Sequence, residues 1–400
     1  MAWPWHPDAA RFALRVAVFQ SAAREVFMNI RSGVSNRIPV AGMTGVAVVV
    51  IGLLASTSTK PLNAAMAANV YHQANLVSDQ PGVALIQDSN LVNPWGITRT
   101  GTSPFWVANN VTGTSTLYSG DVNGSPFVKS SLVVFIPDGL PTGTVSNASN
   151  DFVVTSGTAS GPSRFLFASQ TGIISGWNPN VPPPSPSTHA QIGGAADAVY
   201  TGLAIGQVDG ANFLYAADLE HGRIDVYDKA FHVVSLDGSF TDPNIPNSYS
   251  PFNIQNLGGK LYVTYAQQSH KEPDEETDRG SGFVDVFDTS GHLLQRLILG
   301  NHLNAPWGMA LAPANFGPFS NALLVGNFGD GHIQAFDPES GKFLGRLRDE
   351  GGKPIVIDGL WGIMFGNGAQ GGDTNALYFA SGPDGETHGL FGSLRFVEQP

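Results

Sequence analysis

A Trp-Gly motif at the start of an apolar run recurs along the chain and constrains the fold more than any other feature. It occurs in NPWGITRTG at 93–101, in NAPWGMALAP at 304–313 and in GLWGIMFGNG from Gly359. Each copy leads into strand-like segments joined by a hairpin, such as LLVGNFGDGHIQAFD after the second copy. Aligned on this motif, the chain divides into six units with a period of about fifty residues, which is typical of propeller blades. The sequence therefore predicts an all-β, six-bladed β-propeller with four-stranded blades.

The two ends of the chain complete this pattern. The sixth unit stops near Val397 with only three strands, while the segment 71–79 (YHQANLVSD) precedes the first unit and resembles a fourth strand. We expect 71–79 to join the last blade and close the ring, because closure removes the exposed edges of an open sheet. The second unit is the most degraded and is assigned to 151–179, beginning DFVVTS. The Pro-rich segment 179–191 is interpreted as a linker between the second and third blades.

An apolar segment near the N-terminus predicts export. Arg31 and Arg37 precede an apolar run from Val40 to Ala55, and Ala65-Met66-Ala67 fits a cleavage site. The run is about sixteen residues long, which is short for a bilayer span of about twenty. An uncleaved membrane anchor is the alternative.

This interpretation sets the expected domain boundaries. Met28 is the expected start, residues 1–67 are an overlong N-terminus plus signal peptide, and residues 68–400 form a single propeller domain. We expect an exported monomer, periplasmic or extracellular, that meets a membrane only if the signal segment is uncleaved.

Composition excludes several classes of partner and site. The formal net charge is −12, which argues against nucleic acid because phosphate backbones are bound by clustered Lys and Arg. The chain has no Cys, so disulfides and thiolate metal sites are excluded. A small molecule, a glycan or a protein is the expected ligand.

The Pro-Trp-Gly motif has two interpretations. In the first, Pro sets the turn into the innermost strand of a blade, Trp wedges between neighbouring blades and Gly permits close approach around the channel. In the second, Trp and polar side chains near the starts of the blades line a ligand site. The residues assigned to that ligand site are Asn93, Trp95, Asn109, Asp218, Asn253, Trp307, Asn327 and Trp361.

Histidines recur in the hairpins between the second and third strands of three units. His221, His332 and His388 occupy near-equivalent positions on one predicted rim. Histidines that converge around a funnel could bind a divalent metal such as Zn, Fe or Cu, or one could act as a general base. We keep all three as candidate metal ligands and catalytic residues, with solvated turn residues as the alternative.

An acidic insertion interrupts the fourth unit. The segment 267–282 (QQSHKEPDEETDRGSG) could order around Ca²⁺, which prefers oxygen ligands. It lacks the spacing of a calcium-binding loop, so a solvated flap over the rim is the alternative.

The motifs resemble those of a known repeat family. NAPWGMALA with LLVGNFGDGHIQAFD, and the hairpin in AADLEHGRIDVYD, resemble NHL repeats. Over 70–397 the chain resembles an uncharacterised family of exported bacterial propellers with plant relatives, some of which carry a PEP-CTERM sorting tail. This chain ends SLRFVEQP, so that sorting route is not expected. The resemblance implies the fold and leaves the function open, because propellers of this kind include binders, lyases, lactonases and structural modules.

Three functions therefore stand as hypotheses. The first is an exported propeller that binds a small molecule, glycan or peptide on the face formed by the hairpin loops. The second is a metal-assisted hydrolase or lyase that uses the rim histidines. The third is a structural or cell-surface interaction module.

Overall fold

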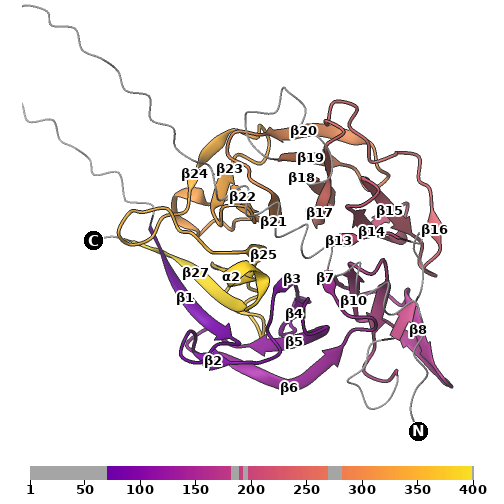
Figure 1. Ribbon diagram of the computed structural model, residues 1–400, viewed down its shortest axis with the longest axis horizontal. Coiled ribbons are helices and arrows are strands. Elements are labelled where there is room, and N and C mark those ends of the chain that lie inside the picture. Colours follow the sequence, from indigo (N-terminus) through magenta and orange to yellow (C-terminus); the bar gives the residue numbers. More distant parts are fainter. Residues whose placement is uncertain (1–69, 182–188, 192–196, 269–281, 399–400) are drawn as a thin grey trace, which may run out of the picture. The chain divides into compact units, whose positions relative to one another are not determined.

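Six sheets, antiparallel except for one short parallel pair in the last, follow one another along the chain and are arranged around one axis (Figure 1). The computed structural model describes residues 70–181, 189–191, 197–268 and 282–398. Within these residues no helix is long and apolar enough to cross a membrane. The predicted signal segment, its cleavage site and most of the acidic insertion lie outside the described residues. The predicted all-β, six-bladed propeller with four-stranded blades is confirmed.

The first three blades are built in chain order from the innermost strand outwards. Blade 1 contains β3 (Pro94–Thr98), β4 (Phe105–Asn109), β5 (Thr114–Ser119) and β6 (Val128–Phe135). Blade 2 contains β7 (Pro141–Ser146), β10 (Phe165–Ser169), β11 (Ile174–Trp177) and β12 (His189–Gln191). Blade 3 contains β13 (Tyr200–Val208), β14 (Ala211–Asp218), β15 (Arg223–Tyr227) and β16 (Val233–Val234).

Blades 4 and 5 repeat this order, whereas blade 6 takes its outer strands from the N-terminal end. Blade 4 contains β17 (Tyr249–Leu257), β18 (Lys260–Gln267), β19 (Phe283–Phe287) and β20 (Leu293–Leu299). Blade 5 contains β21 (Pro306–Leu311), β22 (Leu323–Asn327), β23 (Ile333–Phe336) and β24 (Phe343–Arg346). Blade 6 contains β25 (Leu360–Phe365), β26 (Ala376–Ser381), β27 (Leu390–Val397), β1 (Val70–Ser78) and the short β2 (Ile86–Gln87). The short helical elements are η1 (Gly317–Phe319) and α2 (Pro383–Glu386).

The ring closes through the strand predicted for that role. β1 pairs antiparallel with β27, from Val70 opposite Val397 to Ser78 opposite Leu390. Each innermost strand also contacts the next, in the order β3, β7, β13, β17, β21, β25 and back to β3. The prediction that 71–79 completes the last blade is confirmed.

The assignment of the second blade needs correction. Its innermost strand is β7, with the sequence PTGTVS, and the segment beginning DFVVTS instead forms an additional hairpin of β8 (Val153–Ser156) and β9 (Ala159–Pro162). β7 keeps the Pro-x-Gly spacing but has Thr142 where blades 1, 5 and 6 have Trp, so the motif was missed. The predicted linker 179–191 is also wrong at its end, because β12 pairs with β11 as the outer strand.

Glycine allows the innermost strands to approach closely around the axis. A Cβ on Gly96 would lie 2.5 Å from the Thr142 carbonyl oxygen of the next blade. A Cβ on Gly308 would lie 2.4 Å from the Trp361 carbonyl oxygen. Real Cβ atoms do not approach backbone oxygen so closely, so the expected role of Gly in the motif is confirmed.

Buried carboxylates in the blades lie beside tyrosine hydroxyls and cationic side chains. The Tyr118 hydroxyl donates to Asp88 at 2.8 Å, and Lys129 Nζ lies 2.7 Å from the same carboxylate. Blades 3 and 4 contribute comparable sets, in which a carboxylate group has both a Tyr and an Arg neighbour. In a further set, Tyr and Arg of blade 6 contact the half-buried Asp121, which follows β5 of blade 1. Their members are Asp225 with Tyr200 and Arg223, Asp285 with Tyr265 and Arg296, and Asp121 with Tyr378 and Arg395. Pairing of this kind offsets the free-energy cost of burying charge.

Asp285 of β19 is the most perturbed of these carboxylates. It is completely buried, and Arg296 Nε lies 3.7 Å from its Oδ1. Burial and then the Asp242 carboxylate raise the pKa of Asp285 to about 7, although Arg296 and Tyr265 act in the opposite direction. Asp242 and Asp285 thus share one guanidinium.

The first prediction concerns the close approach of blades 5 and 6. Gly308→Ala should lower the free energy of unfolding by about 1–3 kcal/mol, because the added methyl group forces the β21 and β25 backbones apart. Gly101→Ala is the matched control, since a Cβ there would have nothing within 4 Å. Urea unfolding of both variants tests this, and equal stabilities would contradict it.

The second prediction concerns pH. The raised pKa means that the folded state holds the Asp285 proton more tightly than the unfolded chain does. Its contribution to stability is therefore complete below about pH 4 and is lost as the pH rises to about 7. Asp285→Asn should remove this loss, which is on the order of 2–4 kcal/mol. The free energies of unfolding of both proteins should be compared from pH 4 to pH 8, and parallel curves would exclude the effect.

Candidate functional site

Aromatic rings from four blades fill the channel at the level where the innermost strands begin. Trp95 of β3 stacks on Trp361 of β25 with ring centroids 3.5 Å apart. Trp307 of β21 meets these two rings edge-on at 6.1 and 5.7 Å. Phe252 and Phe328 also contact Trp361, and all five rings are buried. We call these five residues the aromatic plug.

The plug revises the structural interpretation of the motif. The indoles contact one another on the channel side of the blades, and Trp307 Nε1 donates to the Thr201 carbonyl oxygen of blade 3 at 3.0 Å. Trp361 Nε1 donates to Asn93 Oδ1 at 3.0 Å. These Trp side chains therefore join blades across and around the channel, which is a larger role than wedging between neighbours.

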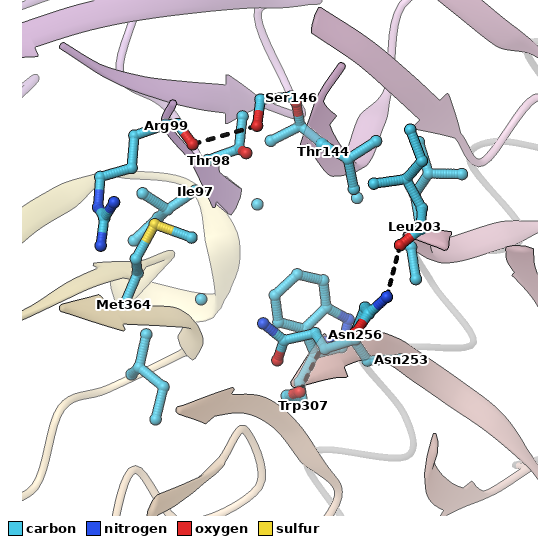
Figure 2. A pocket seen from close by; sticks show the side chains of 18 residues that line it. Ile97, Thr98, Arg99, Thr144, Ser146, Leu203, Asn253, Asn256, Trp307 and Met364 are labelled. Atoms are coloured by element: carbon cyan, nitrogen blue, oxygen red, sulfur yellow. Dashed lines mark hydrogen bonds between the residues drawn. The ribbon is translucent and has the colours of Figure 1, made fainter. Parts of the chain in front are cut away.

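A cavity of about 220 Å³ lies beside the aromatic plug, and all six innermost strands contribute to its walls (Figure 2). The buried Trp307 lies at one end of the cavity. The half-buried Arg99, Ser146 and Asn256 lie at the other end, near the ends of the innermost strands. Exposure rises with distance from the plug, so the cavity opens at the end opposite the hairpins between second and third strands. We call it the axial cavity, and the face that carries those hairpins the hairpin rim.

The walls of the axial cavity combine aliphatic and polar groups. Figure 2 shows Met364 and Arg99 on one side of the cavity, with Leu203 and Asn256 across from them. The aliphatic residues are Ile97, Val145, Leu203, Ala204, Ile205, Ile363 and Met364. The polar residues are Thr98, Arg99, Thr144, Ser146, Asn253, Gln255 and Asn256.

Most of these polar groups bond to the protein backbone. Ser146 Oγ donates to the Arg99 carbonyl oxygen at 3.2 Å, and Asn256 Nδ2 donates to the Ile205 carbonyl oxygen at 2.9 Å. Gln255 Oε1 accepts from the Met309 amide at 2.8 Å. Neither Gln255 Nε2 nor the Thr98 hydroxyl bonds to another described residue.

Arg99 is the one charged residue among those that line the axial cavity. Its Nε donates to the Phe365 carbonyl oxygen at 2.8 Å and its Nη2 to that of Gly366 at 3.0 Å. Within the described ranges it forms no ion pair with a carboxylate. Burial lowers the pKa of the Arg99 guanidinium, because the charged form loses solvation.

All eight residues that the sequence assigned to a ligand site are buried. Of these, only Trp307 and Asn253 reach the axial cavity. Asn253 stands where five other blades have Gly, and its Nδ2 donates to the Trp307 carbonyl oxygen at 2.8 Å. Trp95 and Trp361 lie in the aromatic plug, and Asn93 accepts the Trp361 indole bond.

The remaining three, Asn109, Asp218 and Asn327, end the second strands of blades 1, 3 and 5 and hold local structure. Asn109 Nδ2 donates to the hydroxyls of Thr114 and Thr116. Asp218 accepts from the Val199 amide at 3.1 Å, and Asn327 Nδ2 donates to the His302 carbonyl oxygen at 3.0 Å. Through these hydrogen bonds the three side chains stabilise the turns of the hairpin rim.

The three rim histidines each lie beside a different carboxylate. His221 Nδ1 is 2.7 Å from Asp218 Oδ2, His388 Nδ1 is 2.8 Å from Asp79 Oδ2, and His332 Nδ1 is 3.2 Å from Asp330 Oδ1. In the described part of the chain no group of three or more His, Cys, Asp or Glu side chains could hold a metal ion. The structure therefore gives each histidine its own carboxylate and does not gather His221, His332 and His388 around one cation position.

The lining residues that the sequence analysis missed lie in the second halves of the innermost strands. Thr98, Arg99, Gln255, Asn256 and Met364 follow the Gly position of their blades, which is Asn253 in blade 4, by two or three residues. Arg99 comes directly after β3. A signal was present, because Arg99 is a charged residue directly after the largely apolar segment PWGIT at 94–98.

Comparison with curated proteins finds viral relatives. The chain is 34% identical over 328 residues to "Uncharacterized protein R648" of Acanthamoeba polyphaga mimivirus, covering 80% of this chain and 78% of that protein. It is 34% identical over 330 residues to "Uncharacterized protein L690" of the same virus, covering 80% of this chain and 84% of that protein. No family model matches the chain, so the resemblance to NHL repeats stays a prediction.

Comparison with solved structures agrees with the fold. The α-L-arabinofuranosidase of Fusarium graminearum in complex with arabinobiose aligns with a TM-score of 0.50 and 10% identity. The alignment covers 81% of this chain and 97% of that chain. At this identity the likeness concerns the fold alone.

The third prediction separates a structural from a ligand role for Asn253. Asn253→Ala should lower the free energy of unfolding by about 1–3 kcal/mol, because the buried Trp307 carbonyl oxygen loses its donor. Asn150→Ala, at an exposed asparagine, is the control and should change stability by less than about 0.5 kcal/mol. Chemical denaturation checks both, and an unaltered Asn253→Ala stability would return this residue to the ligand site.

Proposed function

The chain belongs to the family that includes the two mimivirus proteins, and we propose that it is a binding protein that takes up a small molecule in the axial cavity. The observation that carries this proposal is an open cavity with unused polar groups. Ligand sites in proteins are typically concave and mostly apolar, with a few polar groups that fix the orientation of the ligand. The axial cavity is more polar than this, with aliphatic and polar residues in equal number, and the Thr98 hydroxyl and Gln255 Nε2 are free among the described residues.

The size of the axial cavity limits the ligand. Drug-sized molecules occupy pockets of about 300–1,000 Å³, whereas the axial cavity measures about 220 Å³. A water molecule takes about 30 Å³, so the cavity holds a group of roughly seven water-sized units. The expected ligand is therefore a small molecule or one terminal unit of a longer one.

This proposal moves the ligand site away from the hairpin rim. The polar residues assigned to that rim are engaged in hydrogen bonds, and the aromatic plug separates it from the axial cavity. A glycan or peptide fits the proposal only if one end of it enters the cavity.

Catalysis at the hairpin rim is the second candidate function. His221 Nδ1 lies 2.7 Å from Oδ2 of the fully buried Asp218, and the histidine side chain is 36% exposed. A histidine oriented by a carboxylate in this way can act as a general base in a hydrolase or lyase. This candidate needs no common metal site.

Export and a monomeric state are part of the same proposal. They rest on the sequence of residues 28–67 and on the closed ring, in which the last strand already has a partner in β1. A soluble exported propeller with an open axial cavity suits a binding protein that meets its ligand outside the cell.

The fourth prediction tests the location of the site. A set of small polar compounds should be screened by ligand-observed NMR against the wild type, Met364→Trp and Met364→Leu. Met364→Trp should abolish binding of the compounds found, because the larger side chain fills the axial cavity, whereas Met364→Leu should change affinity less than about threefold.

The same screen distinguishes the two candidate functions. Binding that survives in Met364→Trp but is lost in His221→Ala would contradict the axial cavity and support the hairpin rim.

A further inference from the structure

The axial cavity presents no charge to a ligand among the described residues. Arg99 is the one charged residue that lines it, and Figure 2 shows the Arg99 side chain turned away from the cavity. Its guanidinium donates to the carbonyl oxygens of Phe365 and Gly366, between blades 1 and 6. A charged group that leaves water for a cavity without a counter-charge loses solvation and gains no partner. The cavity therefore favours a neutral ligand.

One polar edge of the axial cavity is formed by blades 1 and 2. Thr98 lines the cavity, and its hydroxyl bonds to no other described residue. The oxygen is not one of the enclosed side-chain atoms of the described residues, so it borders open space. Ser146, at the same edge in Figure 2, donates from Oγ to the Arg99 carbonyl oxygen and keeps its lone pairs as acceptors. This edge can both donate to and accept from a ligand hydroxyl.

A second polar edge lies across the channel. Gln255 belongs to β17, which is three blades from β3 in the ring of six, so the two strands lie on opposite sides of the axis. Gln255 Oε1 accepts from the Met309 amide at 2.8 Å, which fixes the side-chain amide. Gln255 Nε2 has no partner among the described residues and is not enclosed, so it is a donor that borders open space.

The walls between these two edges are apolar. Ile97, Leu203, Ile363 and Met364 line the cavity, and the buried Trp307 lies at its closed end. A hydrocarbon segment that packs against these side chains leaves water, which favours binding.

Resting on the proposed function, we propose that the axial cavity takes a small neutral compound with hydroxyl groups at both ends of a hydrocarbon segment. One hydroxyl meets Thr98 and Ser146, and the other accepts from Gln255 Nε2. A hydroxyl group both donates and accepts, so it suits both edges. The cavity volume, about seven water-sized units, sets a limit of about seven non-hydrogen atoms for a ligand held entirely inside.

The test uses probes of equal size that differ in charge or in hydroxyl groups. Pentane-1,5-diol, pentanoate, hexylammonium and hexan-1-ol each have seven non-hydrogen atoms. Binding to the full-length protein is measured by calorimetry and by ligand-observed NMR. The wild type should bind the diol at least about tenfold more tightly than either ion, because neither ion finds a counter-charge. It should bind the diol about three- to tenfold more tightly than hexan-1-ol, which lacks the second hydroxyl.

Variants of the two polar edges then identify the groups responsible. Gln255→Glu keeps an acceptor for the Met309 amide and replaces the free donor by a carboxylate oxygen. It should raise the affinity for hexylammonium at least about tenfold, and this gain should shrink as salt rises. Thr98→Val should remove most of the advantage of the diol over hexan-1-ol. Thr102→Val, at an exposed threonine outside the axial cavity, is the matched control and should keep that advantage.

Circular dichroism of each variant checks its folding. If Thr98→Val does not fold, the four affinities of the wild type and the response of Gln255→Glu to hexylammonium decide the question. An unchanged preference for the diol in Thr98→Val, together with no gain for hexylammonium in Gln255→Glu, would overturn the inference.

The remaining outcomes separate this inference from the proposed function. If an ion binds as tightly as the diol, and Met364→Trp abolishes both, the neutral-ligand inference is overturned and binding in the axial cavity stands. Binding of the diol that is unchanged in Met364→Trp would overturn both. Failure of the diol to bind, while other compounds bind in a manner that Met364→Trp abolishes, would again overturn only the neutral-ligand inference.

Discussion

The architecture depends on how closely six innermost strands approach one another around the axis. At one register position five of these strands have Gly, and a methyl group there would overlap the next blade, as at Gly96 against Thr142 and Gly362 against Trp95. Each innermost strand thus contacts the next, and the last contacts the first. Asn253 is the exception, and it is accommodated because its amide donates to the Trp307 carbonyl oxygen. Because this close approach fixes the spacing of the innermost strands, the position of the outer strands follows from it, since short antiparallel connections join them within each blade.

The aromatic plug and the axial cavity are two consequences of this spacing. The residue before the Gly position is a Trp in three blades and a Phe in one, whereas blades 2 and 3 have Thr142 and Thr201. The smaller Thr residues leave room for the rings of the other blades, and the Thr201 carbonyl oxygen accepts the Trp307 indole bond. Beyond the plug the side chains are aliphatic or short and polar, so the channel is filled at one end and open at the other.

Burial explains why many of the polar residues chosen from the sequence turned out to hold structure. A buried polar group needs a hydrogen-bond partner, and the Asp218 carboxylate and the Nδ2 groups of Asn109 and Asn327 find theirs within the turns and strands around them. The buried Oδ1 atoms of Asn109 and Asn327 have no partner among the described residues. Tight turns and ligand sites favour the same residue types, which is why sequence alone could not separate the two roles. The histidines show the same effect, because each lies against a carboxylate of its own rather than against one another.

The sequence by itself determined the number of blades and the closure of the ring by 71–79, because strand alternation and turn chemistry are local properties that repeat along the chain. It failed at β7, where Thr142 replaces the Trp found in blades 1, 5 and 6. Only the tertiary structure decided which end of the channel is open and which side chains meet at the axial cavity. Those outcomes depend on residues distant in sequence, since Arg99 bonds to Phe365 at a separation of 266 positions. No local sequence pattern indicates such a contact, because it forms only when the ring closes.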